Sequence, residues 1–302
     1  MSAGDLLTEG ARARRLYLDV AHKVDGVLHG EHLGVHQGTG GDLAEARTYQ
    51  PGDDVRRLDW AVLARTGEPH VRTTTPEREL ETTVVIDLTP SMSFGTRVQD
   101  KRSLALTTVA AFSHLASGPG DRLGAVVLTT AGVKRYPPRA TRQAAPHLLS
   151  VLNRVEIGEG AAPPLAEALK AVPLPRRGFV LVVSDLLGER SWDRSLRRLA
   201  QRHDVVVAQT YDPRELELPH VGMLRVVDPE TGRTLDVPTG SRKLRERYAA
   251  AAAARHSDLA ALVRQSGAGH LPLATDGDWL RELTRFLSTR RRVRGARRVA
   301  GT

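Results

Sequence analysis

The N-terminal part of the chain carries a helical hydrophobic pattern. Apolar residues between Leu6 and Leu28 recur at near-helical spacing among polar ones, which predicts a helix over residues 5–28. The Gly- and His-rich stretch 29–42 favours a loop. Residues 43–75 mix short strand-like pieces with a turn at Pro51–Gly52, and Pro76 follows them. We therefore expect a smaller N-terminal annex over residues 1–76.

From Glu77 onward, short apolar runs alternate with helical patterns. The runs are rich in β-branched residues and suit strands that are buried on both faces; they cover residues 80–86, 123–129, 179–183 and 205–209. Helical patterns cover residues 99–117, 141–153, 164–171 and 191–201. This alternation predicts an α/β domain with a doubly wound, mostly parallel sheet and helices on both faces.

The last third of the chain interrupts this alternation once. Residues 222–238 have the pattern of an inserted β-hairpin that turns at residues 228–232. A long Ala-rich helix over 241–266, a short strand near 270–273 and a helix over 278–289 follow. The sheet domain is thus expected over residues 77–289, and the Arg-rich residues 290–302 are expected to form a disordered tail.

The charge of the chain is unevenly distributed. The formal net charge is +9 and the isoelectric point is about 10.4, values that are typical of nucleic-acid binders. Six arginines lie within residues 290–302 without any acid, and without them the net charge is +3. Because the rest of the chain is near neutral, a nucleic-acid or membrane-surface role would have to act through this tail.

Several kinds of chemistry are excluded by composition and motifs. The chain has no cysteine, which rules out disulfides, thiol nucleophiles and thiolate metal sites. It contains no G-x-x-x-x-G-K-[ST] phosphate loop, no G-x-S-x-G elbow and no H-E-x-x-H helix. No run is apolar enough to span a membrane, and the N-terminus lacks a signal-peptide pattern. We expect a soluble, cytoplasmic protein that is not an enzyme.

The strongest candidate chemistry follows the first core strand. Asp87, Thr89 and Ser91 form an Asp-x-Thr-x-Ser pattern between a strand and a helix, and Asp185 follows the third strand. The carboxyl ends of parallel strands meet at one edge of a sheet, where ligands bind. Carboxylate and hydroxyl oxygens suit Mg²⁺. The sequence therefore predicts a divalent-cation site made of these four residues.

A plainer interpretation of the same loop stays open. Asp and Thr are common helix caps, so Asp87 and Thr89 could serve only to cap the next helix and to tie the loop. The second aspartate, at the end of another parallel strand, favours the metal interpretation.

A long charged block lies in the annex. It reads Tyr-Gln-Pro-Gly-Asp-Asp-Val-Arg-Arg-Leu-Asp-Trp over residues 49–60 and is followed by Ala-Arg-Thr-Gly at 64–67. Together with the Asp87 loop and Lys101, it resembles the signature of the domain of unknown function 58 family, whose members are von Willebrand factor A-like proteins. The resemblance covers most of the chain, and its signature residues here are Tyr49, Gly52, Asp53, Asp54, Arg56, Asp59, Trp60 and Arg65.

The resemblance implies a partner and a set of metal ligands. Members of this family are often found alongside MoxR-type AAA-plus ATPases, which implies such an ATPase as the partner and a role as an adaptor or co-chaperone for a client protein. The superfamily's metal ligands carry over as Asp87, Thr89, Ser91 and Asp185, and Mg²⁺ or another divalent cation is the implied cofactor.

One superfamily ligand, the threonine of the second loop, does not carry over. The matching residues 158–165 contain no hydroxyl. Water could take its place, because Mg²⁺ commonly keeps several waters. Alternatively, the site has weakened or lost its metal while the loop still binds a partner.

The signature block has two interpretations of its own. Its charges alternate in sign between Asp53 and Arg65, so it could form a docking surface or a clamp beside the metal loop. It could instead form a buried ion-pair network, anchored by Trp60, that holds the annex on the sheet. We favour the second interpretation, since paired charges beside a tryptophan serve packing more often than chemistry.

The sequence as a whole favours a non-enzymatic binding module. In it, a cation held at the Asp87 loop would bind an acidic side chain of a partner. Two alternatives remain: a metal-assisted hydrolase that uses the same loop, and a nucleic-acid or membrane-surface binder that acts through residues 290–302.

Overall fold

The computed structural model describes residues 3–30, 45–51, 53–55, 58–73, 80–96, 98–118, 120–173 and 177–299. The chain divides into two units. The larger comprises Met1–Gly30 and Leu80–Thr302, and the smaller comprises Glu31–Glu79.

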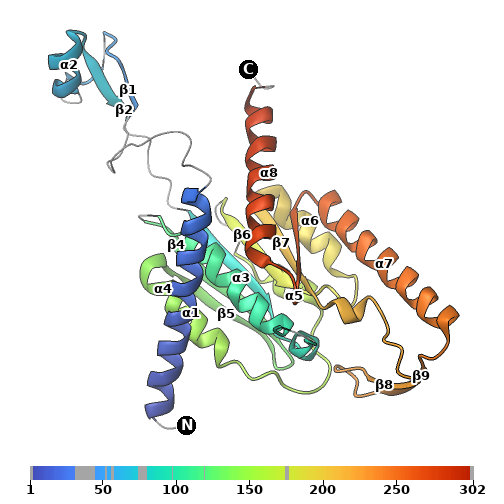
Figure 1. Ribbon diagram of the computed structural model, residues 1–302. Coiled ribbons are helices and arrows are strands. Elements are labelled where there is room, and N and C mark those ends of the chain that lie inside the picture. Colours follow the sequence, from blue (N-terminus) through green and yellow to red (C-terminus); the bar gives the residue numbers. More distant parts are fainter. Residues whose placement is uncertain are drawn as a thin grey trace. The chain divides into compact units, whose positions relative to one another are not determined.

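A six-stranded sheet forms the centre of the larger unit (Figure 1). Its strand order is β10-β7-β6-β3-β4-β5, and every neighbouring pair is parallel except β4 and β5. The predicted doubly wound, mostly parallel sheet is therefore confirmed. Its strands are β3 (Glu81–Asp87), β4 (Arg122–Thr129), β5 (Gly132–Ala140), β6 (Phe179–Ser184), β7 (Asp204–Tyr211) and β10 (Gly269–Ala274).

Helices cover both faces of this sheet. One face packs against α1 (Ala3–Gly30), α3 (Lys101–Leu115), α4 (Thr141–Asn153) and α8 (Trp279–Val299). The other packs against α5 (Leu165–Lys170), α6 (Trp192–Arg202) and α7 (Arg242–Gln265). Successive side chains of a strand point to opposite faces, so Val84 and Ile86 of β3 enter the first core and Val85 enters the second. The fully apolar strands follow from burial on both sides.

Helix α1 belongs to the sheet domain rather than to the annex. Its residues Ala13, Val20 and Val24 are buried in the same core as α3 and α4. The predicted boundary, which grouped residues 1–76, is therefore wrong for this helix. Its apolar stripe needs a partner to be buried, and the short strands of the annex offer too little surface to cover it.

The C-terminal segment also differs from the prediction. Helix α8 continues to Val299, ten residues past the expected end at 289, so residues 290–299 do not form the expected irregular tail. Arginine and alanine are good helix formers, and they prolong a helix that has already been nucleated on the core. No helix in the described part of the chain is long and apolar enough to cross a membrane.

The smaller unit pairs β1 (Glu45–Thr48) with β2 (His70–Thr73) and places α2 (Trp60–Thr66) between them in sequence. The sequence pattern predicts the strands but not this helix. The local chemistry explains it: Asp59 caps α2 by accepting hydrogen bonds from the backbone N–H groups of Ala61 and Val62. Gly67 ends the helix in a left-handed conformation with φ of 75°.

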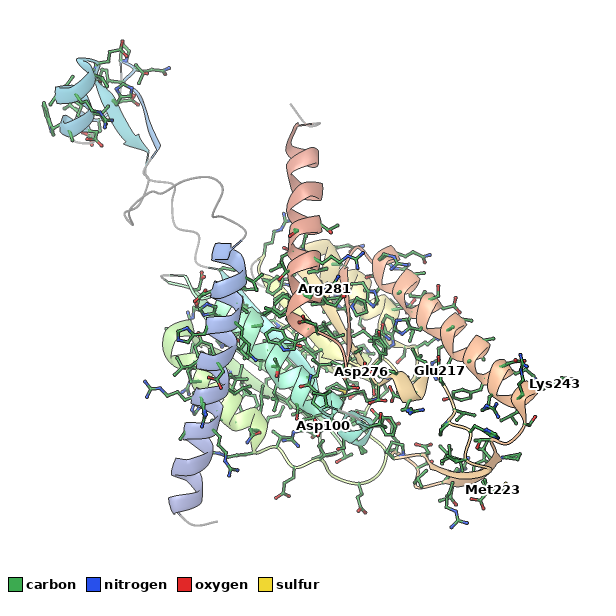
Figure 2. All side chains as sticks on the ribbon, in the orientation of Figure 1. Asp100, Glu217, Met223, Lys243, Asp276 and Arg281 are labelled. Atoms are coloured by element: carbon green, nitrogen blue, oxygen red, sulfur yellow. The ribbon has the colours of Figure 1, made fainter. Side chains whose placement is uncertain are left out.

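A hairpin is inserted between β7 and α7, as predicted. It consists of β8 (Met223–Val227) and β9 (Thr234–Pro238), and a short 3₁₀ helix, η3 (Pro213–Glu215), precedes it. It forms a separate two-stranded sheet beyond the end of the central strands, and Met223 lies on it near Lys243 at the start of α7 (Figures 1 and 2).

Asp212, at the end of β7, joins the loops at this edge of the sheet. Its side chain is fully buried and accepts hydrogen bonds from the backbone N–H and the hydroxyl of Thr96, at 2.9 and 2.8 Å, and from the hydroxyl of Thr275 at 2.6 Å. The backbone N–H of Arg214 donates a further bond at 2.8 Å. Burial opposes ionisation of Asp212, but these donors outweigh it and lower the pKa below its ordinary value. Asp212 thereby fixes the loop that follows β3.

Asp212→Asn should therefore lower the free energy of unfolding by about 2–4 kcal/mol at pH 7, because an amide accepts fewer of these hydrogen bonds. A carboxyl group whose pKa is depressed in the folded state stabilises above its unfolded pKa of about 4, and that contribution disappears as the pH falls through the folded value. Urea unfolding at pH 7 and pH 3 should show the difference shrinking at the lower pH. An equal loss for Asp236→Asn, which removes an exposed carboxylate, would contradict this account.

Candidate functional site

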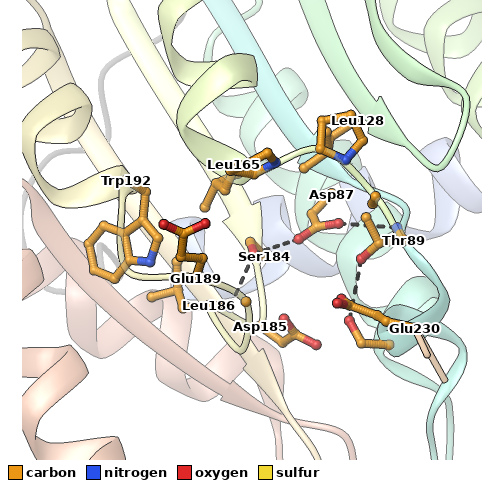
Figure 3. Close-up of a pocket in the computed structure, with 15 residues that line it drawn as sticks. Asp87, Thr89, Leu128, Leu165, Ser184, Asp185, Leu186, Glu189, Trp192 and Glu230 are labelled. Atoms are coloured by element: carbon orange, nitrogen blue, oxygen red, sulfur yellow. Dashed lines mark hydrogen bonds between the residues drawn. The ribbon is translucent and has the colours of Figure 1, made fainter. Parts of the chain in front are cut away.

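The predicted ligands converge at the carboxyl end of β3 and β6. Asp87, Thr89, Ser91 and Asp185 all line one cavity of about 140 Å³ (Figure 3). All four side chains are buried, with at most 7% of their surface exposed. The parallel pairing of β3 with β6 brings them together across almost a hundred residues of sequence. The rest of the described lining is Leu128, Ala162, Pro163, Pro164, Leu165, Ser184, Leu186, Gly188, Glu189, Trp192 and Glu230.

Asp87 holds the two strand ends together. One carboxylate oxygen accepts the backbone N–H of Thr89 at 3.1 Å, and the other accepts the hydroxyl of Ser184 at 2.8 Å. Ser184 in turn accepts the backbone N–H of Leu186 at 3.1 Å. The orientation of the Asp87 carboxylate is therefore set from both loops (Figure 3).

The hydroxyls of Thr89 and Ser91 lie 3.3 Å apart on the cavity wall. Ser91 belongs to the short helix η2 (Pro90–Ser93), at whose start the side chain of Thr89 makes no capping bond. The longer helix α3 is capped by Asp100 instead. Helix capping therefore does not explain Asp87 and Thr89, although Asp87 does tie the loop. The two hydroxyls are left facing the cavity as a pair of oxygen donors.

Asp185 belongs to a buried ion triad that the sequence pattern does not predict. Its Oδ2 accepts a hydrogen bond from Lys101 Nζ at 2.7 Å, and Lys101 also donates to Glu215 at 2.6 Å. Lys101 is completely buried. Burial opposes its charge, but the two carboxylates outweigh burial and raise its pKa above the ordinary value. The resemblance placed Lys101 in the family pattern; the structure shows what it contacts.

The backbone after Asp185 adopts an unusual conformation. Leu186 has φ of 58°, the left-handed region that residues other than glycine rarely adopt, and its side chain is buried. Such a conformation costs about 1–3 kcal/mol and persists only where the surroundings impose it. Here it turns the chain so that Ser184, Asp185 and Leu186 all line the cavity. Strain of this kind clusters at functional sites.

The electrostatics of the cavity favour a cation. Burial, and next the charge of Asp185, raise the pKa of Asp87 to about 6, although hydrogen bonds from Thr89 and Ser184 act in the opposite direction. A carboxylate held under these conditions is stabilised by any positive charge that enters the cavity. Two hydroxyls and two carboxylates are the hard oxygen donors that Mg²⁺ prefers, so the residues present fit a divalent cation.

The second loop contributes no donor side chain, as the sequence indicated. The wall from Ala162 to Leu165 is apolar. In the described part of the chain no three His, Asp or Glu side chains are close enough to hold a metal by themselves. Any cation at this edge must therefore rely on the hydroxyls of Thr89 and Ser91 and on water as well as on carboxylates.

The annex residues show two local structural roles. The backbone N–H of Asp53 donates to the carbonyl of Gln50 at 3.0 Å, while the Asp53 side chain accepts the N–H of Gln50 at 2.9 Å, so the predicted Pro51–Gly52 turn is confirmed at its two ends. Tyr49 extends the pairing of β1 and β2 through its N–H bond to Pro69. Gly52 and Arg56 lie outside the described residues.

Trp60 does not act as a buried anchor within this unit. It begins α2, 67% of its surface is exposed, and α2 buries none of its residues. Asp54 and Arg65 are exposed too. A two-stranded sheet and one short helix form too small a core to cover an indole, so Trp60 is not buried within the smaller unit, and the ion-pair network that would hold the annex on the sheet stays a prediction. Within this unit, Asp54, Trp60 and Arg65 are exposed to solvent.

Comparison with known proteins identifies the family. The family model described as protein of unknown function DUF58 matches residues 45–258. The chain belongs to the DUF58 family. An uncharacterized protein of Mycobacterium tuberculosis (strain H37Rv) is 45% identical over 93% of this chain and 90% of its own length. An uncharacterized protein of Mycobacterium avium is 38% identical over 52% of this chain and 95% of its own.

Several solved structures share part of the α/β fold of this DUF58 protein. Solved structures similar to it include the conserved hypothetical protein BatB of Bacteroides thetaiotaomicron, with a TM-score of 0.42, 15% identity, and coverage of 69% of this chain and 99% of that one. The von Willebrand A domain of SpRpn10 has a TM-score of 0.36 and 10% identity over 68% of this chain and 94% of its own.

Because the pKa of Asp87 is raised, its ionised side chain lowers the stability of the metal-free folded state. Since the folded value of about 6 exceeds the unfolded one, the native state takes up a proton as the pH falls from above 6 toward 4, and the wild type gains stability over that interval. Asp87→Asn should therefore be more stable than the wild type by about 1–3 kcal/mol at pH 7.5 in EDTA, with the difference narrowing at pH 4.5.

Urea unfolding of both proteins at the two pH values measures this difference, with the exposed Asp19→Asn on α1 as the control. A less stable Asp87→Asn at pH 7.5 would show that the hydrogen bonds of Asp87 outweigh its burial.

Proposed function

We propose that this DUF58 protein is a non-enzymatic protein-binding module that holds a divalent cation, Mg²⁺ in the first place, at the Asp87 cavity. The observation that carries the proposal is the convergence of two buried carboxylates and two hydroxyls on one cavity, with a repulsion between Asp87 and Asp185 that a cation relieves. Thr89, Ser91, Asp87 and Asp185 are the residues that would hold it. When bound, the cation supplies a positive charge with exchangeable coordination positions.

An acidic side chain of the partner is the group that best suits this cavity. A carboxylate completes the shell of a bound cation and matches its charge. Trp192, which is 1% exposed, also lines the cavity, and its buried Nε1–H has no hydrogen-bond partner among the described residues. A buried donor without a partner is costly, so an acceptor oxygen brought in by a ligand would be stabilised here.

The hydrogen bonds of the two aspartates support binding rather than catalysis. A general base needs a carboxylate that is free to take a proton from the substrate. Both oxygens of Asp87 are engaged by Thr89 and Ser184, and both oxygens of Asp185 are engaged by Leu187 N–H and Lys101. Among the described residues that line the cavity there is no histidine. This arrangement supports a role of the two aspartates as ligands rather than as bases.

As partner we propose a MoxR-type AAA-plus ATPase, with this protein as its adaptor or co-chaperone for a client. The support for this partner is the family membership, together with a cavity that suits an acidic side chain.

Capture of the MoxR-type ATPase from the same genome on the immobilised full chain, in Mg²⁺ and in EDTA, tests this function. We expect capture in Mg²⁺, at least a tenfold loss in EDTA, since coordination of a carboxylate is worth more than 1.4 kcal/mol, and the same loss for Asp87→Ala. Asp19→Ala, an exposed acid on α1, is the matched control and should bind as the wild type does.

Equal capture in Mg²⁺ and EDTA would remove the cation from the proposal. Absence of capture by a correctly folded wild type would remove this ATPase as the partner.

A further inference from the structure

The inserted hairpin sends one side chain into the Asp87 cavity. Glu230, at its tip, lines the cavity together with Thr89 and Ser91 (Figure 3). Its neighbours Asp228, Pro229 and Thr231 are exposed, whereas Glu230 is half-buried. The hairpin thus places a single acid of its tip against a loop more than a hundred residues earlier in the chain.

Hydrogen bonds within the turn fix the backbone on either side of Glu230. The two oxygens of Asp228 accept the backbone N–H of Glu230 at 2.9 Å and the hydroxyl of Thr231 at 2.6 Å. The backbone N–H of Gly232 donates to the carbonyl of Asp228 at 2.8 Å, and Gly232 has φ of 68°, which glycine adopts without strain. The turn is therefore specified locally, and Glu230 is the residue that it presents to the cavity.

The segment that leads into the hairpin also contacts the residues around Asp185. Glu215, which lies just before the hairpin in η3, accepts a hydrogen bond from Lys101, and the same ammonium group holds Asp185. Glu215 also accepts the backbone N–H of Asp212 at 3.0 Å. Glu215, in the segment that leads into the hairpin, and Glu230, at its tip, thus both lie at the site that contains Asp185.

An acid in this position is unfavourable without a cation. Burial raises the pKa of Glu230, and the charges of Asp185 and Asp228 raise it further. Four carboxylates, those of Asp87, Asp185, Glu189 and Glu230, line one small cavity, while Lys101 is already shared between Asp185 and Glu215. Among the other lining residues, Ala162, Pro163 and Pro164 provide no donor side chain, so the hairpin brings an oxygen donor that the second loop lacks.

We propose that Glu230 is an intrachain outer ligand of the Asp87 site: its carboxylate holds a water of the bound cation, in place of the missing second-loop hydroxyl. This inference rests on the cation site proposed above. It also gives the hairpin a role in recognition, because an acidic side chain of the partner competes with Glu230 for the same cation.

Titration of the full chain with Mn²⁺, monitored by the EPR signal of free Mn²⁺, tests the assignment. We expect one site in the wild type, loss of that site in Asp87→Asn, and binding weakened by about tenfold in Glu230→Gln, because each ligand charge and each neighbour that orients a ligand contributes on this scale. Asp236→Asn is the matched control: it removes one negative charge from the same hairpin at an exposed pair with Arg225, and it should change the affinity less than twofold.

The outcomes separate the two proposals. A site that is lost in Asp87→Asn but is equally strong in Glu230→Gln and Asp236→Asn overturns the role of Glu230 and leaves the cation site standing. If Glu230→Gln and Asp236→Asn weaken Mn²⁺ binding equally, the effect comes from the net charge of the hairpin, and the assignment of Glu230 is overturned as well. Mn²⁺ binding that does not depend on Asp87 overturns the cation site, and the role of Glu230 with it.

Discussion

The buried ammonium of Lys101 is the contact on which the arrangement of this sheet edge depends. It lies between Asp185 and Glu215, at 2.7 and 2.6 Å, with none of its own side chain exposed. Removing one partner of such a buried pair typically costs 3–5 kcal/mol, because the remaining charges are then desolvated without compensation. Lys101 therefore fixes the third-strand loop, through Asp185, and the stem of the inserted hairpin, through Glu215, relative to the start of α3.

Two other buried carboxylates at this edge, those of Asp212 and Asp87, differ in the number of hydrogen bonds that they accept. Asp212 has four hydrogen bonds and a lowered pKa, so it acts as a structural anion. Asp87 has only two and lies near Asp185, and its pKa is raised to about 6. The carboxylate of Asp212 thus stabilises the loop that it binds, whereas the negative charge of Asp87 is not compensated to the same extent. Such a difference in environment supports the proposal that Asp87 is a functional residue.

The sequence predicted most of the sheet, because strands buried on both faces leave continuous apolar runs that alternate with helical periods. Helix α4 begins and ends where it was expected, at residues 141 and 153. The short helix α2 was missed, since its stability comes from the Asp59 cap and Gly67 rather than from a periodic apolar face. Assignment of α1 to the annex failed because periodicity shows that a helix has an apolar face but does not show which partner covers it.

The sequence predicted those residues of the cavity that directly follow a strand. Asp87, Thr89, Ser91 and Asp185 follow from the rule that parallel strands end at one edge. Ser184, Lys101 and Glu230 complete the cavity or its charges without a sequence signal specific to that role, because a buried lysine and a loop glutamate look like ordinary surface residues in a sequence. The strained backbone at Leu186 likewise carries no mark in its residue type. These features arise only from tertiary contacts.

Terbium luminescence excited through tryptophan tests most directly whether a cation binds in this cavity. Of the three tryptophans, Trp192 lines the cavity, whereas Trp60 belongs to the smaller unit and Trp279 packs in the core on the other face of the sheet. The account predicts sensitised Tb³⁺ emission from the wild type, loss of most of it in Trp192→Phe with Tb³⁺ still bound, and little change in Trp279→Phe. Emission that survives Trp192→Phe undiminished would place the cation elsewhere and contradict the account.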